Sequence, residues 1–370
     1  MNRLAVPFLL LALAVPLCAQ SPLTDLQKRF AAEAQKLDQT RPTAEQRQAL
    51  LEQHVAQLLQ FVADDAKGDD RWNGRLMLAD LHLFLGARGP ATQALRGIDA
   101  KEAPPMALIA AAVTAQRLNL KTERATWIDA ALAKPAPKAD QLAMARLLST
   151  VLHEVERGDK LFDDALAAAK DDEQRALVRW HRADTKRDRE DLPDNAAYED
   201  LETLAKDLPN TYWGGVAKDR LRATQLKPGD PAITFVAKTR DGANWSLTEQ
   251  AGKAVVLAFF TLADHDTPAL VSMLAEQRRQ HGANLSIVGI CLDRDALAIA
   301  AGLPALGIDF PVIGDGQGTQ TDAALRWFAE GPVVHVVDAG GKLWARDQHA
   351  GTKDARDELQ AAIAAAIKAK

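Results

Sequence analysis

The chain contains very little cysteine, with only Cys18 and Cys291 among its 370 residues. Cys18 falls within an N-terminal stretch that has the features of a removable export signal, so the mature chain is expected to keep one thiol. A single thiol cannot form an intramolecular disulfide. A protein of this size can be exported without disulfides, because its cores are large enough to be stable without them.

Basic runs and long apolar runs are also scarce. The 45 Lys and Arg residues are outnumbered by 50 Asp and Glu residues, which gives a formal net charge of −5. Nucleic-acid binding depends on a concentrated positive surface, so nucleic acid is not expected as a partner. After residue 20 no stretch is long and apolar enough to cross a bilayer, which predicts no membrane span in the mature chain. No His-x-His or His-Glu-x-x-His pattern occurs, and the sequence predicts no metal site and no cofactor.

The first twenty residues, Met1–Gln20, predict an export signal. Arg3 supplies the positive charge, Leu4–Leu17 form an apolar core too short for a membrane span, and small residues near Ala19 offer a cleavage site. The protein is therefore expected in the periplasm or outside the cell. The alternative is a lipoprotein with Cys18 as the lipidated residue, but the three residues before Cys18 are not the small ones that such a site prefers.

Residues 21–226 predict an all-α domain. Ala, Leu, Glu, Gln, Lys and Arg dominate this part, and all of them favour helices. Between Leu50 and Val62, apolar residues recur at spacings of three and four, as they do on one face of a helix. Segments rich in Gly, Pro and Asp interrupt the helices and divide them into antiparallel pairs.

One of these pairs has a sequence similar to a known repeat. Trp72, Ala79, Gly86 and Ala94 follow one another in an order that resembles a tetratricopeptide unit. The resemblance implies a helical-repeat domain whose concave surface binds an envelope protein or peptide. The alternative is a packed helical domain in which the tryptophans are core residues, namely Trp127, Trp180 and Trp213.

A different pattern begins at the stiff junction Lys227-Pro228-Gly229-Asp230-Pro231 and predicts a second, α/β domain over residues 227–370. Ala254–Phe260 is a continuous apolar run of strand length, which favours a strand covered on both faces. A polar turn follows, and after Pro268 the apolar residues recur at helical spacing. Such a turn, between a strand and a helix, is where α/β proteins often place their chemistry.

Several short segments of this second part form an ordered series. They are the junction with Phe235, Asp241-Gly242 with Ser246-Leu247, Gly252-Lys253 with Val255–Phe260, Ser286–Leu292 with Asp293, Phe310-Pro311-Val312 with Asp315-Gly316, Gly331-Pro332 before Val333–Asp338, and Gly340-Gly341-Lys342. The series resembles the thioredoxin-fold redoxin class, which includes TlpA-like thiol–disulfide reductases and AhpC/TSA peroxiredoxins. The resemblance implies a thioredoxin fold, with Pro332 as a cis-proline that faces the polar turn.

The polar turn lacks the cysteines on which both kinds of redoxin depend. Aligned without gaps, the reductases' Cys-x-x-Cys falls on Asp264-His265-Asp266-Thr267, and the peroxiredoxin cysteine falls on Leu270 or Ala269. Thiolate is the nucleophile in both reactions, and a carboxylate or hydroxyl cannot exchange disulfides. The resemblance therefore implies a thioredoxin fold that has lost its redox centre.

Asp264, His265 and Asp266 remain as candidate site residues. Three adjacent polar groups at the end of a strand could bind a metal ion or act in acid–base catalysis. Adjacent residues do not converge on one ion without help from distant ligands, so we favour a solvated turn. In that interpretation Asp266 or Thr267 caps the helix that Pro268 begins.

The sequence leads to one favoured function and two alternatives. The favoured hypothesis is an exported, redox-inactive module that mediates protein interactions or serves a structural role in the cell envelope. The second is a thiol–disulfide oxidoreductase or peroxiredoxin-like antioxidant enzyme that uses Cys291 or a partner's thiol. Cys291 ends an apolar strand, where a lone thiol is usually a small core residue. The third is metal-assisted hydrolysis at Asp264 and His265.

Overall fold

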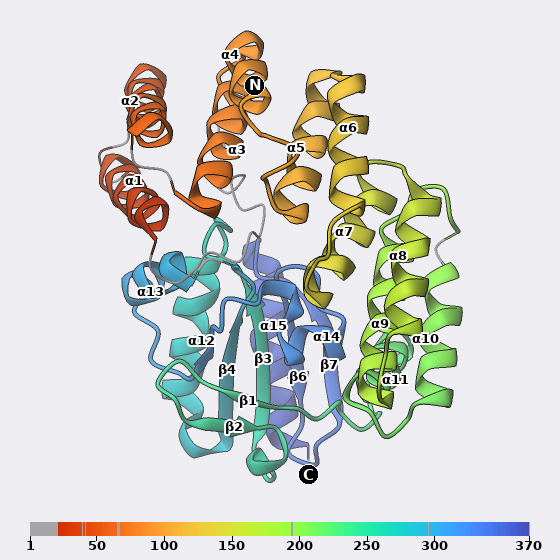
Figure 1. The fold of residues 1–370 in the computed structure, drawn as a ribbon. Coiled ribbons are helices and arrows are strands. Elements are labelled where there is room, and N and C mark those ends of the chain that lie inside the picture. The colour runs from red at the N-terminus through yellow and green to blue at the C-terminus, as the bar shows by residue number, and fades with distance from the viewer. Residues whose placement is uncertain are drawn as a thin grey trace. The chain divides into compact units, whose positions relative to one another are not determined.

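The computed structural model describes residues 21–369 except 39, 41, 65, 66, 194 and 295. The chain forms two compact units, Met1–Ala197 and Tyr198–Lys370. The described part of the first unit is helical and the second contains a mixed sheet covered by helices (Figure 1), so the predicted fold class is confirmed. The predicted export signal Met1–Gln20, with Cys18, lies outside the described residues.

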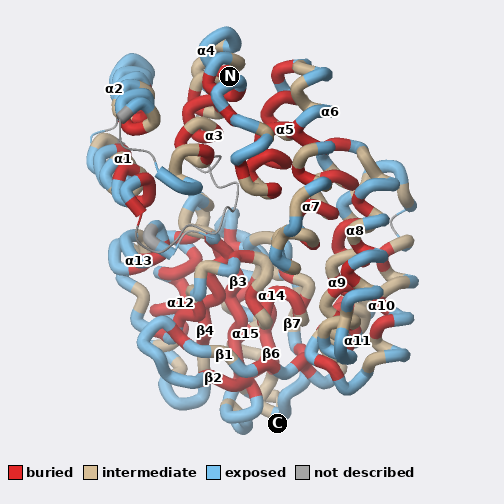
Figure 2. The backbone as a smooth tube through the Cα atoms, viewed as in Figure 1, coloured by how far each residue is buried: buried red, intermediate tan, exposed pale blue. Residues whose placement is uncertain are grey.

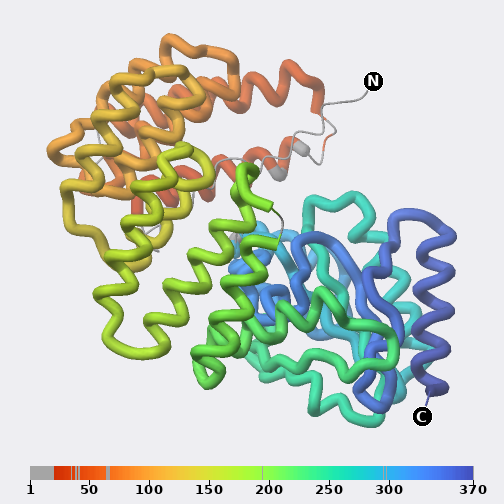
Figure 3. Tube along the Cα trace, turned by 90° about the vertical axis from the view of Figure 1, so that its right-hand side faces the viewer, coloured from red at the N-terminus to blue at the C-terminus, as the bar shows by residue number. Residues whose placement is uncertain are grey.

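The first unit is built of helical hairpins (Figures 1 and 3). Its described helices are α1 (Pro22–Asp38), α2 (Ala44–Asp64), α3 (Asp69–Phe84), α4 (Arg88–Arg96), α5 (Pro105–Leu118), α6 (Lys121–Leu132), α7 (Lys138–Thr150), α8 (Val155–Ala167) and α9 (Asp172–Arg187). The helices pack closely within the pairs α3–α4, α5–α6 and α7–α8. The first helices of these pairs also pack in sequence, α3 on α5, α5 on α7 and α7 on α9. The unit is therefore a linear array of hairpins.

The hairpins follow one another at a nearly constant spacing. The helices α3, α5, α7 and α9 begin at Asp69, Pro105, Lys138 and Asp172, so successive starts lie 36, 33 and 34 residues apart. A tetratricopeptide repeat has 34 residues. The helical-repeat character expected from the sequence is present, and the tetratricopeptide assignment itself remains a prediction.

Buried apolar residues form the core of the first unit, and buried positions are red in Figure 2. Trp72 and Ala79, which carried the resemblance to a repeat unit, are both buried, and so are Trp127 and Trp180. Trp213 differs, because it lies on a helix of the second unit and is only half-buried, with an edge contact to Tyr212. The core interpretation is therefore confirmed for Trp127 and Trp180 and is wrong for Trp213.

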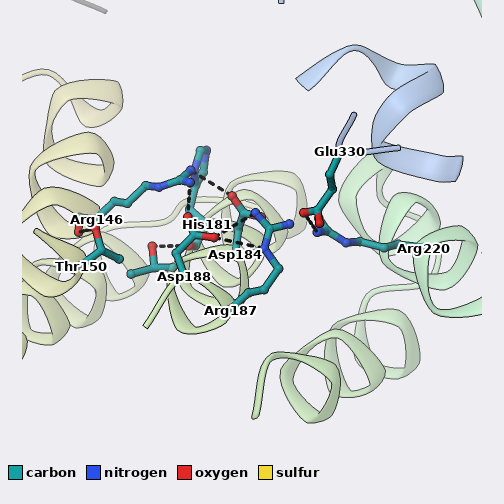
Figure 4. Close-up of polar contacts among 9 residues, drawn as sticks. Arg146, Thr150, His181, Asp184, Arg187, Asp188, Arg220 and Glu330 are labelled. Carbon is teal, nitrogen blue, oxygen red and sulfur yellow. Dashed lines mark hydrogen bonds and ion pairs between the residues drawn. The ribbon is translucent and has the colours of Figure 1, made fainter. Parts of the chain in front are cut away.

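An ionic network joins the α7 and α9 helices (Figure 4). The guanidinium of Arg146 on α7 donates to the buried carboxylate of Asp184 at 3.0 Å and also to Asp188, which follows α9. Arg187 reaches both of these carboxylates at 3.1 Å. Because Asp184 is only 3% exposed, removal of Arg146 would leave a poorly solvated charge, and the pairing fixes how these two helices meet.

The second unit contains the sheet. Its described elements are α10 (Ala196–Asp207), α11 (Tyr212–Gln225), β1 (Val236–Lys238), β2 (Asn244–Ser246), η1 (Thr248–Gln250), β3 (Ala254–Phe260), α12 (Thr267–His281), η2 (Gly282–Asn284), β4 (Leu285–Cys291), α13 (Ala296–Ala305), β5 (Val312–Ile313), η3 (Gly318–Gln320), α14 (Asp322–Trp327), β6 (Val333–Val337), β7 (Leu343–Gln348) and α15 (Lys353–Lys368). Its main sheet has the order β5-β4-β3-β6-β7. β3 is parallel to β4 and antiparallel to β6, and β1 pairs with β2 as the expected hairpin at Asp241-Gly242.

The centre of the sheet is β3, whose seven residues are all buried (Figure 2). Alternate residues face opposite layers, as the period of a strand requires. Val256, Ala258 and Phe260 pack into the core formed with α12, α13 and α15. Val255 and Leu257 join the opposite core, which contains residues of α11, α14 and the segment around β1 and β2. The apolar run predicted from the sequence is thus a strand covered on both faces.

β4 can lie close to its neighbours because it carries Gly289. A Cβ built at this position would lie 2.9 Å from a ring carbon of Phe260 and 3.3 Å from a ring carbon of Phe310. Any larger residue would displace these rings from the core. No helix among the described residues combines the length and apolarity needed to cross a bilayer.

The α11 helix belongs to the second unit, although the sequence placed the domain boundary after it, at 226/227. Asp219 on α11 pairs with Arg326 on α14 at 2.6 Å, and the hydroxyl of Tyr212 donates to Asp322 at 2.7 Å. Arg220 is also buried, over the ring of Phe328, and its guanidinium lies 3.8 Å from the carboxylate of Glu330 (Figure 4). These contacts explain why the compact division falls earlier, after Ala197.

The proline-rich junction is fastened to the second unit. The N–H of Gly229 donates to Leu343 at 2.7 Å, and the N–H of Leu343 donates to Asp230 at 2.8 Å. Backbone held in this way resists proteolysis. The connection between α9 and α10 differs, since Asp188, Glu190 and Asp191 in it are exposed.

We therefore predict that limited proteolysis cuts between residues 188 and 195 before it cuts between 227 and 231. Mass spectrometry of the early fragments would locate the cut, and thermal melting of the purified fragments would show whether each unit folds alone. Early cleavage confined to the 227–231 junction would contradict this prediction and restore the boundary expected from the sequence.

A buried histidine makes the second unit sensitive to acid. His335 on β6 is 2% exposed, stacks on Trp327 at 4.9 Å and accepts at Nδ1 from the Asp347 N–H at 3.2 Å. Burial lowers the pKa of His335 to about 4, although nearby Asp347 opposes the shift. The folded protein therefore keeps this imidazole neutral at a pH where an unfolded chain, with a His pKa of about 6.5, would protonate it.

We predict that the free energy of unfolding falls as the pH drops from about 6.5 to about 4, by up to about 3 kcal/mol for His335. Above this window neither state binds the proton, and below it both do, so the loss is confined to it. His335→Leu should flatten the slope of stability against pH in urea melts, whereas a change at exposed His349 to Gln should not. An unchanged slope in His335→Leu would contradict the assignment.

Candidate functional site

The polar turn between β3 and α12 lies at the carboxyl end of the central strand. The carbonyl of Thr261 accepts from the Asp264 N–H at 3.3 Å and from the Thr267 hydroxyl at 2.7 Å. Thr267 is 1% exposed, so its hydroxyl closes the turn from the inside. The polar turn expected from the sequence thus connects β3 to α12, and the residue onto which the resemblance places the second reductase cysteine is this buried threonine.

Asp264, and not Asp266, is the carboxylate that organises the turn. Its Oδ1 accepts from the Asp266 N–H at 3.0 Å, and its carbonyl accepts from the Thr267 N–H at 3.2 Å. Asp266 precedes α12, but its side chain accepts no hydrogen bond from the helix; only its carbonyl accepts, from Leu270 at 2.9 Å. The expectation that Asp266 caps the helix is therefore wrong. The reason is its helical backbone, with φ −85° and ψ −17°, since a capping side chain requires the extended region.

His265 projects from the turn and its side chain is 90% exposed. Its Nδ1 lies 3.4 Å from Asp264 Oδ1, and its Nε2 lies 3.2 Å from Asp266 Oδ1. One ligand atom from each of the three residues can be chosen so that all lie within 4.8 Å of one another. A divalent cation would take its ligands from this triad, but each imidazole nitrogen faces a different carboxylate. The arrangement is also that of an exposed histidine lying between two carboxylates with no ion.

The other side of the Asp266 carboxylate contacts the loop between β7 and α15. A Cβ built at Gly351 would lie 2.6 Å from Asp266 Oδ2, so glycine is required for the two segments to approach so closely. The carboxylate is 29% exposed, which leaves it partly solvated. The turn is thus packed against a neighbouring loop and contains no thiol among its described residues.

Asp293 supports the turn from the neighbouring strand, a role that the sequence did not reveal. It is 7% exposed and follows β4, and its Oδ2 accepts from the Leu262 N–H at 2.8 Å and from the Cys291 thiol at 3.1 Å. β3 and β4 are parallel, so their carboxyl ends meet at one edge of the sheet. An acidic residue directly after the second buried strand was the signal that could have predicted the contact.

Cys291, the only cysteine among the described residues, is fully buried at the end of β4. Burial raises the pKa of its thiol to about 12, and the adjacent carboxylate of Asp293 raises it further, against an opposing hydrogen bond from the Asp293 backbone. A thiol must ionise and reach its substrate in order to react. Both the burial and the raised pKa of Cys291 oppose such reactivity, and its burial agrees with the prediction of a small core residue.

Pro332 differs from the family expectation. The structure contains no cis peptide bond among its described residues, so the Gly331–Pro332 bond is trans. Pro332 is exposed, and the residues that follow it enter β6 directly. Leu270, onto which the peroxiredoxin alignment places the reactive cysteine, lies on α12 and is buried in the core.

The strand order, the mixed sheet and the helix that leaves the central strand through a polar turn define a thioredoxin-like domain. The AhpC/TSA family model matches residues 228–345. A Mycobacterium tuberculosis relative that carries the name peroxiredoxin is 33% identical over an alignment of 139 positions; the match covers 33% of this chain and 85% of the relative. The chain belongs, through its C-terminal part, to the AhpC/TSA family.

Solved structures of thiol–disulfide proteins are similar to the same part of the chain. A thiol:disulfide interchange protein DsbE from Chlorobium tepidum is 22% identical, covers 38% of this chain and 99% of its own, and has a TM-score of 0.35. A secreted disulfide oxidoreductase from Mycobacterium tuberculosis is 22% identical, covers 35% of this chain and 95% of its own, and has a TM-score of 0.31.

We predict that Asp264→Ala lowers the free energy of unfolding by about 1 kcal/mol, because the turn loses a side-chain acceptor for its backbone. Asp266→Ala should cost less than about 0.5 kcal/mol, since its side chain makes no cap. His265→Ala serves as the matched exposed control. Urea melts of the three variants would measure the differences, and a larger loss in Asp266→Ala than in Asp264→Ala would contradict the assignment.

Proposed function

We propose that this AhpC/TSA-family protein is redox-inactive and acts as a protein-interaction or structural module of the cell envelope. The observation that carries the proposal is the replacement of the redox thiols by Asp264 and Thr267 in a turn that is otherwise well formed. Both side chains take part in the hydrogen bonds that close the turn. Neither can form the mixed disulfide on which the family reactions depend.

The alternative, an oxidoreductase that uses Cys291, has little support in the geometry. With a pKa of about 12, only about one Cys291 thiol in 10⁵ is ionised at pH 7. The sulfur lies beneath the end of β4, where its hydrogen goes to Asp293. A peroxide or a disulfide would have to enter the core to reach it.

The helical unit is the proposed binding part. An array of stacked hairpins presents an extended surface, and such arrays commonly bind proteins or peptides. Leu59 on α2 and Phe84 at the end of α3 are 48% and 51% exposed, which gives this unit apolar contacts to offer. The positive, apolar and small residues within Met1–Gln20 support export, and we place the mature protein in the periplasm or outside the cell.

We predict that the mature chain, residues 21–370, neither reduces insulin nor consumes hydrogen peroxide faster than dithiothreitol alone. The matched positive control is the double variant Asp264→Cys with Thr267→Cys, which restores both thiols of the reductase turn and should gain measurable insulin reduction. Cys291→Ser should behave as the wild type. Turnover in the wild type that disappears in Cys291→Ser would overturn the proposal and establish the enzyme.

The binding role is tested separately. The helical unit and the full mature chain, each immobilised, would be exposed to envelope extract, and captured proteins identified by mass spectrometry. Capture of the same partner by both, unaffected by His265→Ala, supports recognition by the hairpins. Capture only by the full chain and its loss in His265→Ala would place recognition at the former redox turn.

A further inference from the structure

A cavity of about 490 Å³ opens in the C-terminal unit at the end of the sheet opposite the polar turn. Its walls come from the residues just before β3, the first residues of β4, and the carboxyl end of α12. β3 is seven residues long, so the cavity lies about 20 Å along the strand from that turn. Its volume is within the range of small-molecule sites.

The polar groups around this cavity are mainly donors, and two of them are cationic. The ammonium of Lys253 has no hydrogen-bond or ion-pair partner among the described residues, and neither the Trp245 indole N–H nor the Ser286 hydroxyl bonds to one. Arg278 pairs only with Asp309, at 3.7 Å, and its side chain is 42% exposed. None of the described residues that line the cavity is acidic. An anionic group would therefore find free donors of the right sign.

The remaining walls are apolar. Ile287 and Pro311 line the cavity beside the indole of Trp245, which is 5% exposed and held against Phe235 with 5.2 Å between ring centroids. A flat, fixed aromatic wall suits an apolar or aromatic ligand body. The donors and the apolar walls together describe a ligand with one charged end and one apolar end.

The α12 helix limits how much negative charge the charged end of the ligand can carry. Its carboxyl end lines the cavity and carries the partial negative charge of the helix dipole. A dianion such as phosphate would be opposed by this dipole and would find no helix amino terminus to bind it. A carboxylate carries half the charge and needs only two or three donors.

We propose that this cavity is a binding site for a small organic monocarboxylate with an apolar or aromatic body. The carboxylate lies between Lys253 and Arg278, with Ser286 as a further donor, and the body lies against Trp245 and Ile287. The inference goes beyond the proposed interaction role and does not depend on whether the polar turn has redox activity, because the two lie at opposite ends of the sheet.

The test is isothermal titration calorimetry of the mature chain with phenylacetate and with octanoate, each compared with its neutral amide. Phenylacetate or octanoate should bind at millimolar concentration or below, and about tenfold more tightly than its amide, which corresponds to about 1.4 kcal/mol. Lys253→Gln and Arg278→Gln should each weaken binding of the acid several-fold and leave binding of the amide unchanged. Raising the salt concentration should weaken binding of the acid only.

Arg279→Gln is the matched control. Arg279 is the next residue on α12, is 63% exposed and pairs with Glu276 at 2.6 Å, and it does not line the cavity. Lys253 is exposed and Arg278 is half-exposed, so their variants should melt as the wild type does, which circular dichroism would verify. Absence of binding by both acids, equal binding of acid and amide, or an equal effect of Arg279→Gln would overturn the proposal.

Discussion

The structure of the C-terminal unit depends on the burial of β3 on both faces. A strand in this position can satisfy its backbone only through its neighbours, and β4 and β6 supply those hydrogen bonds on either side. Alternate side chains of β3 pack into two separate cores, so a shift of register by one residue would move every side chain of the strand into the opposite core. This constraint fixes where the chain leaves the sheet, and hence where the polar turn stands.

The features of the fold that depend on local patterns could be predicted from the sequence. The uninterrupted apolar run predicted the observed bounds of β3. Pro268 marked the start of α12, because proline lacks the N–H that a strand needs for its hydrogen bonds but suits the first turn of a helix. Gly- and Pro-rich breaks likewise marked the hairpins of the first unit. These signals act over a few residues and need no knowledge of the rest of the chain.

Contacts between distant segments could not be predicted in this way. The bond from Leu262 to Asp293 joins residues 31 positions apart, and only the pairing of β3 with β4 brings them together. The sequence favoured Asp266 as the acceptor for backbone N–H groups, whereas in the structure Asp264 is that acceptor. The difference depends on the helical backbone conformation of Asp266, which its local sequence does not determine. Pro332 was assigned from a resemblance, and the trans peptide bond at this position is a property of this chain.

The polar turn places two carboxylates, and no thiol among its described residues, at the amino terminus of α12. The amino terminus of α12 carries a partial positive charge, which in a redoxin would favour a thiolate. Here Asp264 and Asp266 place two carboxylates at the same helix end. The positive end of the helix favours both carboxylates; Asp264 accepts from the backbone, and both lie beside His265.

The linear arrangement of hairpins in the first unit has a consequence for how that unit folds and changes length. Each of the pairs α3–α4, α5–α6 and α7–α8 is completed within about 30 residues of chain, and it meets the next pair through α3, α5, α7 and α9. Such local closure allows assembly to start at any pair and spread outward, without waiting for the chain ends to meet. Duplication or deletion of one hairpin would leave every other interface intact, so the reach of this unit can be lengthened or shortened in whole steps.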